Sequence, residues 1–188
     1  MSEQNLVNRR EFVRTAGTAV AATSLLGADV VFGQTPPARR RYAIIGTGER
    51  ATGMWGRQIR ERYSDVVQFV GLSDINPKRV EASKALMGVD CPTFATFDEM
   101  VDKARPDVIM VTTKDALHSG YIVKALDRGL DVMTEKPMVI DETQCQAVLD
   151  AEKRNNKKIV VTFNYRYAPK HRTVKEVLMS GEIGRVLS

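Results

Sequence analysis

Residues 46–51, which read Gly-Thr-Gly-Glu-Arg-Ala, constrain the fold of this chain more than any other feature of its sequence. The short apolar run Tyr42–Ile45 comes directly before them, and a helix of about a dozen residues, ending near Arg62, is expected directly after them. In such a loop the first glycine permits a tight turn, the second lets the backbone approach a pyrophosphate, and the small sixth residue lets the helix pack on the strand. The free N–H groups at the start of that helix then bind phosphate. Because glycine pairs occur in many turns, the motif gains its weight from the strand and helix that flank it.

The pattern of strand followed by helix continues to residue 163. A second apolar strand, residues 66–72, ends at Ser73-Asp74. Thr96–Glu99 forms a capping box that opens a short helix, and Gly129 closes a helix expected from His118 to Arg128. The remaining predicted elements are strands at 107–112, 131–134 (the fifth) and 158–163 (the sixth), with a helix from Asp141 to Lys153. Six strands with helical crossovers predict an α/β fold with a doubly wound parallel sheet, the Rossmann fold, whose ligand lies at the carboxyl ends of the strands.

Asp74 closes the second strand, where a dinucleotide-binding fold places the acid that accepts hydrogen bonds from a ribose. Its charge would repel a 2′-phosphate and therefore favours NAD over NADP, although Lys78 and Arg79 lie close enough to weaken that preference. The alternative is that Asp74 caps the next helix, but Asn76, which precedes Pro77, is the better cap candidate. NADP therefore stays open beside NAD.

Polar side chains also follow the later strands, at the same edge of the predicted sheet. The fourth strand ends in Thr112-Thr113, with His118 five residues beyond; the fifth ends in Glu135-Lys136-Pro137 and the sixth in Asn164-Tyr165-Arg166-Tyr167. Charged and amide groups that end one strand after another on one edge indicate a binding site. With the glycine loop, the residues predicted to bind the cofactor are Gly46, Thr47, Gly48, Glu49, Arg50, Ala51, Asp74, Asn76, Thr112, Thr113, His118, Glu135, Lys136, Asn164 and Arg166.

These motifs, in this order, resemble the Gfo/Idh/MocA oxidoreductases, the family of glucose–fructose oxidoreductase and inositol dehydrogenase. The resemblance covers Tyr42 to Val186. Besides the glycine loop and Asp74 it rests on the stretch from Thr113 to His118, on Glu135-Lys136-Pro137, on Asn164-Tyr165-Arg166 and on Gly181–Val186. It implies a nicotinamide-dependent oxidoreductase that acts on a sugar, a cyclitol or a related polyol.

The resemblance also places Lys136 near the nicotinamide ring and the substrate hydroxyl, and so makes Lys136 the expected catalytic residue. Oxidation of an alcohol requires removal of the hydroxyl proton as hydride leaves carbon, and a lysine can assist that removal. Glu135 would position the cofactor or the lysine. Without the other motifs, Lys136 would be interpreted as a solvated turn residue paired with Glu135.

One departure from the family pattern lies after the fourth strand. The family commonly has Thr-Pro-Asn where this chain has Thr113-Lys114-Asp115, so a rigid turn is missing and two charges are added. The detailed contacts of Thr113 are therefore in doubt. For His118, the alternative to cofactor binding is a solvent-facing residue at the start of a helix.

The sequence predicts an export signal and linker at 1–38, and the resemblance implies a dinucleotide-binding Rossmann domain at 39–165 followed by only the start of a second, α+β substrate domain at 166–188. In the family the second domain supplies substrate contacts and usually the oligomer interface. We therefore expect this chain by itself to bind the cofactor weakly, to turn over no substrate and to form a homo-oligomer only with that domain present.

The first forty residues have the pattern of a twin-arginine signal peptide. Asn8–Arg14 resembles the twin-arginine consensus, Thr15–Ala28 is uncharged and only moderately apolar, and Val31-Phe32-Gly33 offers small residues for cleavage before Gln34. The pattern predicts recognition by the twin-arginine export machinery and a periplasmic or otherwise exported bacterial protein. An amphipathic first helix and an uncleaved membrane anchor are the alternatives.

Charge placement argues against a nucleic-acid-binding protein. The net charge is +5, but residues 1–41 contribute +3 and the remaining residues only +2, with aromatic residues at 6% of the chain. Cys91 and Cys145 show no metal-binding spacing, so no metal site is expected and two unpaired thiols are the simplest interpretation. Export would permit a disulfide.

Two other functions remain open at this point. Some relatives cleave glycosidic bonds by transient NAD-dependent oxidation, an exception to the usual two-carboxylate scheme, and such an enzyme recycles a bound NAD where a dehydrogenase consumes free NAD. A non-enzymatic dinucleotide-binding protein is the third reading, and it would not need Lys136.

Overall fold

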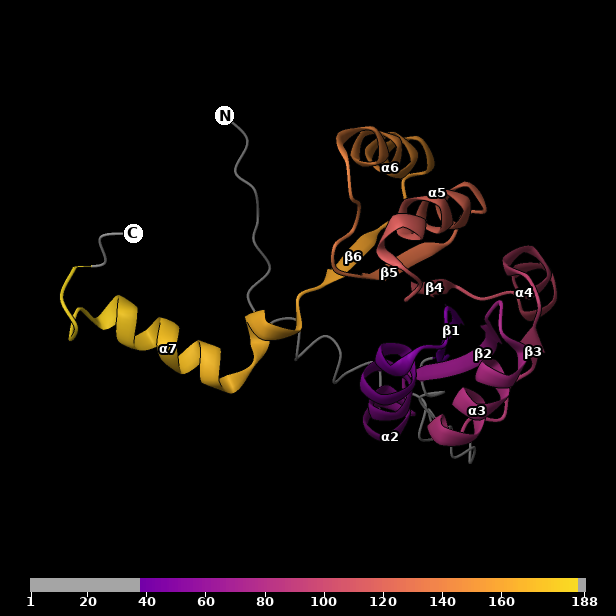
Figure 1. Cartoon of the computed structure of the whole chain (residues 1–188), viewed down its shortest axis with the longest axis horizontal. Coiled ribbons are helices and arrows are strands. Elements are labelled where there is room, and N and C mark those ends of the chain that lie inside the picture. Colours follow the sequence, from indigo (N-terminus) through magenta and orange to yellow (C-terminus); the bar gives the residue numbers. More distant parts are fainter. Residues whose placement is uncertain (1–37, 186–188) are drawn as a thin grey trace, which may run out of the picture. The chain divides into compact units, whose positions relative to one another are not determined.

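In the computed structural model, residues 38–185 are described and form an alternating series of strands and helices (Figure 1). The strands are β1 (Arg40–Ile45), β2 (Val67–Ser73), β3 (Thr93–Phe94), β4 (Val108–Val111), β5 (Asp131–Glu135) and β6 (Ile159–Thr162). The α-helices are α2 (Gln58–Tyr63), α3 (Pro77–Met87), α4 (Phe97–Ala104), α5 (His118–Asp127), α6 (Glu142–Asn155) and α7 (Pro169–Ser180). A π-helix, η1 (Arg50–Arg57), precedes α2, and the 3-10 turns η2 (Asp115–Leu117) and η3 (Asn164–Tyr167) precede α5 and α7.

The strands form one sheet in the order β3-β2-β1-β4-β5-β6, and every pair is parallel. The order reverses between β1 and β4, which is the crevice where doubly wound sheets bind ligands. The predicted Rossmann fold is therefore confirmed. The sequence pattern assigned no residues to the third strand, and β3 is only two residues long, too short to carry an alternation of apolar and polar side chains.

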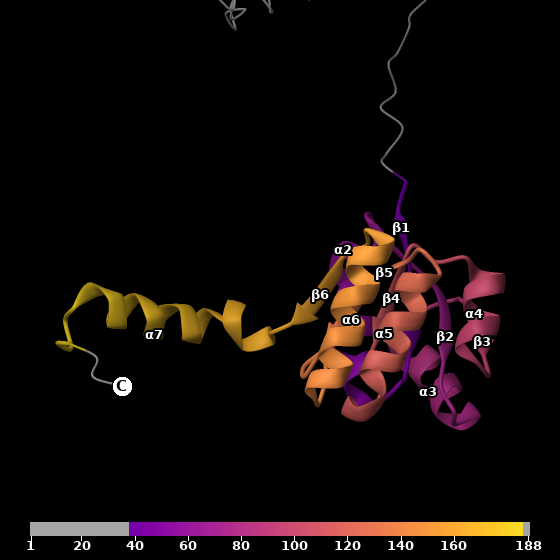
Figure 2. The same ribbon diagram turned by 90° about the horizontal axis from the view of Figure 1, so that it is seen from above.

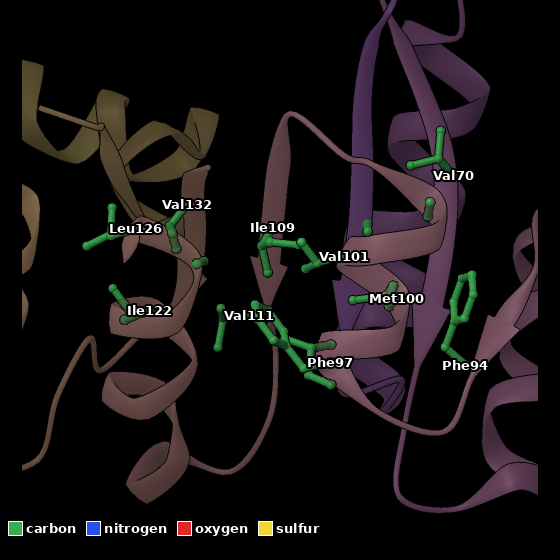
Figure 3. Close-up of a cluster of buried hydrophobic side chains, with 14 of the residues drawn as sticks. Val70, Phe94, Phe97, Met100, Val101, Ile109, Val111, Ile122, Leu126 and Val132 are labelled. Atoms are coloured by element: carbon green, nitrogen blue, oxygen red, sulfur yellow. The ribbon is translucent and has the colours of Figure 1, made fainter. Parts of the chain in front are cut away.

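Helices cover both faces of the sheet, because alternate residues of the central strands point to opposite sides. Ala43 and Ile45 of β1 belong to a core under α4, α5 and α6, whereas Ile44 belongs to a second core under η1 and α3. Figure 2 shows α5 and α6 side by side over β4, β5 and β6. In Figure 3 the side chains of α4 and α5 gather around β4, and the labelled members of this cluster are Val70, Phe94, Phe97, Met100, Val101, Ile109, Val111, Ile122, Leu126 and Val132.

The arginines before the first apolar run belong to the folded domain. Arg40 forms an ion pair with Asp131 at the start of β5. The N–H of Arg41 donates to Asp107 Oδ2 at 2.8 Å, and its guanidinium donates to the carbonyl oxygens of Ala104 and Arg105. β1 therefore begins two residues before the predicted Tyr42, because acids at the amino ends of neighbouring strands neutralise these cations.

Three predicted helix starts are confirmed by their caps. The Asn76 side chain accepts from the N–H groups of Lys78 and Arg79, as expected before Pro77. Thr96 accepts from the N–H of Glu99 and opens α4, and Asp141 opens α6 by accepting from Gln144. Each filled cap contributes about 1 kcal/mol to helix stability.

The helix after the glycine loop differs from the prediction. Its first two turns, η1, are π-helical, and only Gln58–Tyr63 is α-helical. Gly56 in η1 packs against Met87 of α3, where an added Cβ would lie 2.5 Å from the methionine Sδ and Cε atoms. π-helical segments are rare and are frequently found at functional sites. No sequence pattern distinguishes one from an α-helix here.

The twin-arginine signal predicted for residues 1–38 falls almost wholly outside the described residues, as does Val186 of the last motif. Of the predicted second domain, residues 166–185 are described; they comprise the end of η3, the helix α7 and a short turn. Within 38–185 no helix is long and apolar enough to cross a membrane. The two cysteines are free, as expected, and burial raises the pKa of the Cys91 thiol to about 11.

Candidate functional site

The glycine loop between β1 and η1 is fixed by hydrogen bonds to the ends of β2 and β4. Gly46 has φ +87°, and an added Cβ would lie 2.8 Å from the carbonyl oxygen of Thr112. The Thr112 hydroxyl donates to the Gly46 carbonyl at 2.6 Å, and the Gly46 N–H donates to the Ser73 carbonyl at 2.8 Å. Gly46 therefore provides the tight turn predicted for it, and only glycine fits both the backbone angle and the space.

Gly48 lies in different surroundings, since no heavy atom lies within 4 Å of the position of its missing Cβ. The helix that starts at Arg50 has no side-chain cap at Glu49 and no acid in its first turn. Its first N–H groups and the positive end of its dipole therefore stay available to an anion. Ala51 is fully buried against the sheet, as the motif predicts for its small sixth residue.

Asp74 ties the glycine loop to the end of β2. Its Oδ2 accepts from the Thr47 N–H at 2.8 Å and from the Thr47 hydroxyl at 3.0 Å, while its Oδ1 accepts from the Asn76 N–H at 2.9 Å and lies 3.6 Å from Arg79. Burial alone would raise the pKa of this carboxyl, but the hydrogen bonds from Asn76 and Thr47 and the charge of Arg79 together lower it. Both carboxylate oxygens of Asp74 already accept hydrogen bonds from the protein. A ribose hydroxyl would therefore have to donate to an oxygen that keeps these bonds.

Glu135, the last residue of β5, is held by the helix that follows the glycine loop. Arg50 donates to both of its carboxylate oxygens at 3.0–3.2 Å, and Trp55 Nε1 donates to Oε1 at 2.5 Å. The neighbouring Lys136 is exposed, and only its backbone N–H contacts Glu135, at 3.3 Å. In the alternative reading Lys136 is a solvated turn residue paired with Glu135. The exposure of Lys136 fits that reading, but the pairing is not seen, because Arg50 and Trp55 bind the Glu135 carboxylate.

His118 has no accessible surface, which excludes the solvent-facing alternative. Its Nδ1 lies 2.7 Å from the carbonyl oxygen of Pro137, and its Nε2 lies 3.1 Å from that of Thr113. The ring thus joins the loop after β4 to the turn after β5, where the Lys136–Pro137 peptide is cis. His118 also lines the second hollow, with both ring nitrogens within hydrogen-bond distance of backbone carbonyl oxygens. Its contact with the cofactor stays a prediction.

Lys114 stands where the family commonly has proline, yet its backbone keeps the shape that proline would impose. Its φ is −70° and its ψ is 145°, within the range of a proline residue. The missing proline therefore does not alter the turn, and the charges of Lys114 and Asp115 remain as the real departure.

Two hollows lie on either side of the glycine loop. The first, of about 440 Å³, is lined by Thr47, Gly48, Glu49, Thr52, Gly53, Arg57, Arg79, Ala82, Ser83 and Leu86. The second, of about 640 Å³, is lined by Arg50, Thr112, Thr113, Asp115, His118, Glu135, Lys136, Phe163, Asn164 and Tyr165. Loops from four neighbouring strands therefore meet at one edge of the sheet, as the sequence predicts.

Some predicted residues lie outside both hollows. Arg166 is exposed and lines neither of them, and the Asn76 side-chain oxygen is taken up by its helix cap. Sequence reasoning missed Trp55, whose contact with Glu135 depends on the π-helical register, and Arg57, whose only sequence signal is its charge. Among residues 38–185 no group of three or more His, Cys, Asp or Glu side chains is arranged to hold a metal ion.

The residues at this edge fit a dinucleotide. Gly48 leaves open the approach of a phosphate to the backbone, and the helix start beyond it presents uncapped N–H groups. The hollows on the two sides of the loop give room for the two halves of such a molecule.

Comparison with known proteins agrees with this geometry. Residues 40–163 match the Gfo/Idh/MocA family, described as an oxidoreductase family with an NAD-binding Rossmann fold. The chain belongs to this family. The expected resemblance is thus confirmed for the Rossmann domain, and the family description confirms a nicotinamide dinucleotide as the cofactor.

Among curated relatives, YteT of Bacillus subtilis, named as an oxidoreductase, is 41% identical over 153 residues, which are 79% of this chain and 36% of that protein. Inositol 2-dehydrogenase of Klebsiella pneumoniae is 31% identical over 78% of this chain and 43% of that enzyme. The crystal structure of myo-inositol 2-dehydrogenase from Lactobacillus plantarum has a TM-score of 0.69 and 25% identity, covering 79% of this chain and 43% of that one. The chain spans less than half of the length of these relatives.

Proposed function

We propose that this chain forms the cofactor-binding part of a nicotinamide-dependent oxidoreductase that acts on a sugar, a cyclitol or a related polyol. The observation that carries the proposal is the meeting of the glycine loop and the exposed Lys136 at one edge of the sheet. The relatives support the substrate class, because two of them are inositol dehydrogenases.

The cofactor preference between NAD and NADP rests on Asp74. A crystal structure of WlbA dehydrogenase from Bordetella pertussis contains NADH, and one of KijD10 from Actinomadura kijaniata contains NADP, so neighbours of this fold take either. Asp74 is charged at neutral pH and its pKa is lowered. The negative charge of Asp74 would repel the 2′-phosphate of NADP, and we therefore propose NAD as the preferred cofactor.

Each group of the chain has a distinct task in this proposal. The amides after Gly48 hold the pyrophosphate, and the Asp74 carboxylate accepts from a ribose hydroxyl. The bound nicotinamide supplies the acceptor for a hydride from the substrate carbon. Lys136, which lines the second hollow with Thr113 and Asn164, takes part in removing the proton of the substrate hydroxyl.

We further propose that a second domain begins at residue 166, that it supplies the remaining substrate contacts, and that the protein is exported through the twin-arginine route. The adjacent Arg9 and Arg10 and the uncharged stretch after them support the export route. Export of a folded protein suits an enzyme that acquires its cofactor before leaving the cytoplasm.

The experiment that tests cofactor binding is a titration of the chain with NAD and, separately, with NADP. Trp55 is the only tryptophan of the chain and contacts Glu135 in the wall of the second hollow, so its emission reports on the site. We expect saturable binding of NAD, weaker binding of NADP, and loss of affinity for NAD in Asp74→Ala. The Asp65→Ala variant, which removes an exposed carboxylate, is the control for charge. A chain that is folded by circular dichroism and binds neither nucleotide would contradict the proposal.

A further inference from the structure

Glu135 is a buried carboxylate whose partners come from the phosphate-binding helix. Only 6% of its surface is accessible. Arg50 reaches Oε1 through Nε at 3.2 Å and through Nη2 at 3.0 Å, and it reaches Oε2 at 3.2 Å. Trp55 adds a short bond of 2.5 Å to Oε1. The two residues lie about 80 positions before Glu135 in the chain, so these bonds join the first and second halves of the sheet.

The π-helical register explains how both side chains reach one carboxylate. Arg50 is the first residue of η1 and Trp55 is its sixth, five positions later. In an α-helix residues five apart point in directions about 140° apart. In a π-helix, whose hydrogen bonds join residues five apart, such residues lie nearly above one another. An α-helical η1 would therefore direct these two donors to different sides of the helix.

The arrangement leaves Lys136 without its adjacent carboxylate. Within residues 38–185 Lys136 forms no ion pair, although Glu135 is its neighbour in the chain and Asp115 lines the same hollow. An ammonium held by a carboxylate in an ion pair is less able to act on a substrate hydroxyl. Sequestering Glu135 therefore keeps the Lys136 side chain available to the hollow.

We propose that Arg50 and Trp55 are positioning residues that form a clamp on Glu135, hold this carboxylate away from the Lys136 ammonium, and couple the phosphate-binding helix to the Lys136 turn. The part played by Lys136 in catalysis rests on the proposed function. The clamp itself rests on the contacts of three side chains and stands without it.

The first test uses the indole N–H of Trp55, which gives a single resonance in a ¹⁵N–¹H spectrum because the chain has one tryptophan. A short hydrogen bond to a carboxylate is strong, so we expect this resonance to lie downfield and to exchange slowly with water. Glu135→Gln is expected to move it upfield and speed its exchange. An indole N–H that exchanges as fast as free tryptophan in the folded chain would overturn the clamp.

The second test measures how fast Lys136 reacts with an N-hydroxysuccinimide ester, by mass spectrometry, relative to the exposed Lys153 of α6. In Arg50→Gln the freed carboxylate can pair with the ammonium, so acylation of Lys136 should slow by roughly 1.4- to 5-fold, the range expected for an exposed ion pair. The double variant Arg50→Gln/Glu135→Gln should restore the rate, since the competing carboxylate is gone. A purely structural role for Arg50 predicts no such restoration.

Arg62→Gln removes the same charge from the exposed side of the same helical segment and should leave the rate unchanged. If Arg50→Gln does not fold, Arg50→Lys takes its place in the same comparison, because lysine keeps the charge but lacks the planar fork that binds both carboxylate oxygens. An unchanged Lys136 rate in the folded single variant, or a slow rate that Glu135→Gln does not restore, would refute the proposal. Because neither test requires a nucleotide, failure of the NAD titration and failure of the clamp are separate results.

Discussion

The two glycines of the loop carry different tasks, and replacing each with alanine should separate them. In Gly46→Ala an L-residue must adopt φ +87°, which costs about 1–2 kcal/mol. Its Cβ would also meet the Thr112 carbonyl oxygen and the Thr113 nitrogen at 2.8 Å, and relieving such overpacking costs about 1–3 kcal/mol more. We therefore expect the free energy of unfolding to fall by about 2–5 kcal/mol.

Gly48→Ala should leave folding intact and damage binding. Its φ lies outside the left-handed region and the position of a Cβ is open, so the smaller entropy of the unfolded chain should raise stability by about 0.4–1 kcal/mol. The methyl group would stand where the pyrophosphate approaches, and we expect affinity for NAD to fall at least about tenfold, which is 1.4 kcal/mol. Urea unfolding followed by Trp55 emission gives the stabilities, and calorimetric titration gives the affinities.

A Gly48→Ala variant that binds NAD as tightly as the parent chain would refute the role of Gly48, and a Gly46→Ala variant as stable as the parent would refute that of Gly46. The first result would show that the backbone at Gly48 does not contact the pyrophosphate, and the second that the turn at Gly46 does not need glycine.

Three further predictions concern single positions. Lys114→Pro should stabilise the chain by about 0.4–1 kcal/mol and raise its melting temperature, because the φ of Lys114 is already −70° and its N–H makes no hydrogen bond within the described residues. A lower melting temperature would show that the turn needs that N–H. Ser73→Ala should stabilise the chain by about 1 kcal/mol in urea unfolding, since the buried Ser73 hydroxyl has no partner within residues 38–185. The lowered pKa of Asp74 means that its contribution to stability is present above the unfolded value of about 3.9 and is lost as pH falls through the folded value. The stability difference between the parent and Asp74→Asn, measured from pH 6 to pH 3, should therefore shrink as pH falls.

Much of the fold could be predicted because its signals are local. The glycine loop, the cap of Asn76 before Pro77 and Gly129 after α5 each depend on a few neighbouring residues, and the structure confirms all three. The continuous apolar runs gave the buried strands β2 and β4, since strands covered on both faces lack alternation.

The parts that could not be predicted depend on contacts between distant residues. The register of η1 is set by Gly56 against Met87 and by the shared carboxylate of Glu135, and neither is visible in a window of sequence. The burial of His118 depends on two carbonyl groups from separate loops. The pattern at its own position fits a solvent-facing residue equally well.

The adjacent strands β1 and β4 join the first and second halves of the sheet, so partial unfolding can begin between them. Residues from the first half, such as Gly46 and Arg50, meet Thr112 and Glu135 of the second half along this line. Partial unfolding that separates the two halves would destroy the site while each half kept its own strands. A bound dinucleotide should therefore suppress that opening above all, by RT ln(1 + [L]/Kd), and amide hydrogen exchange should slow most along β1 and β4.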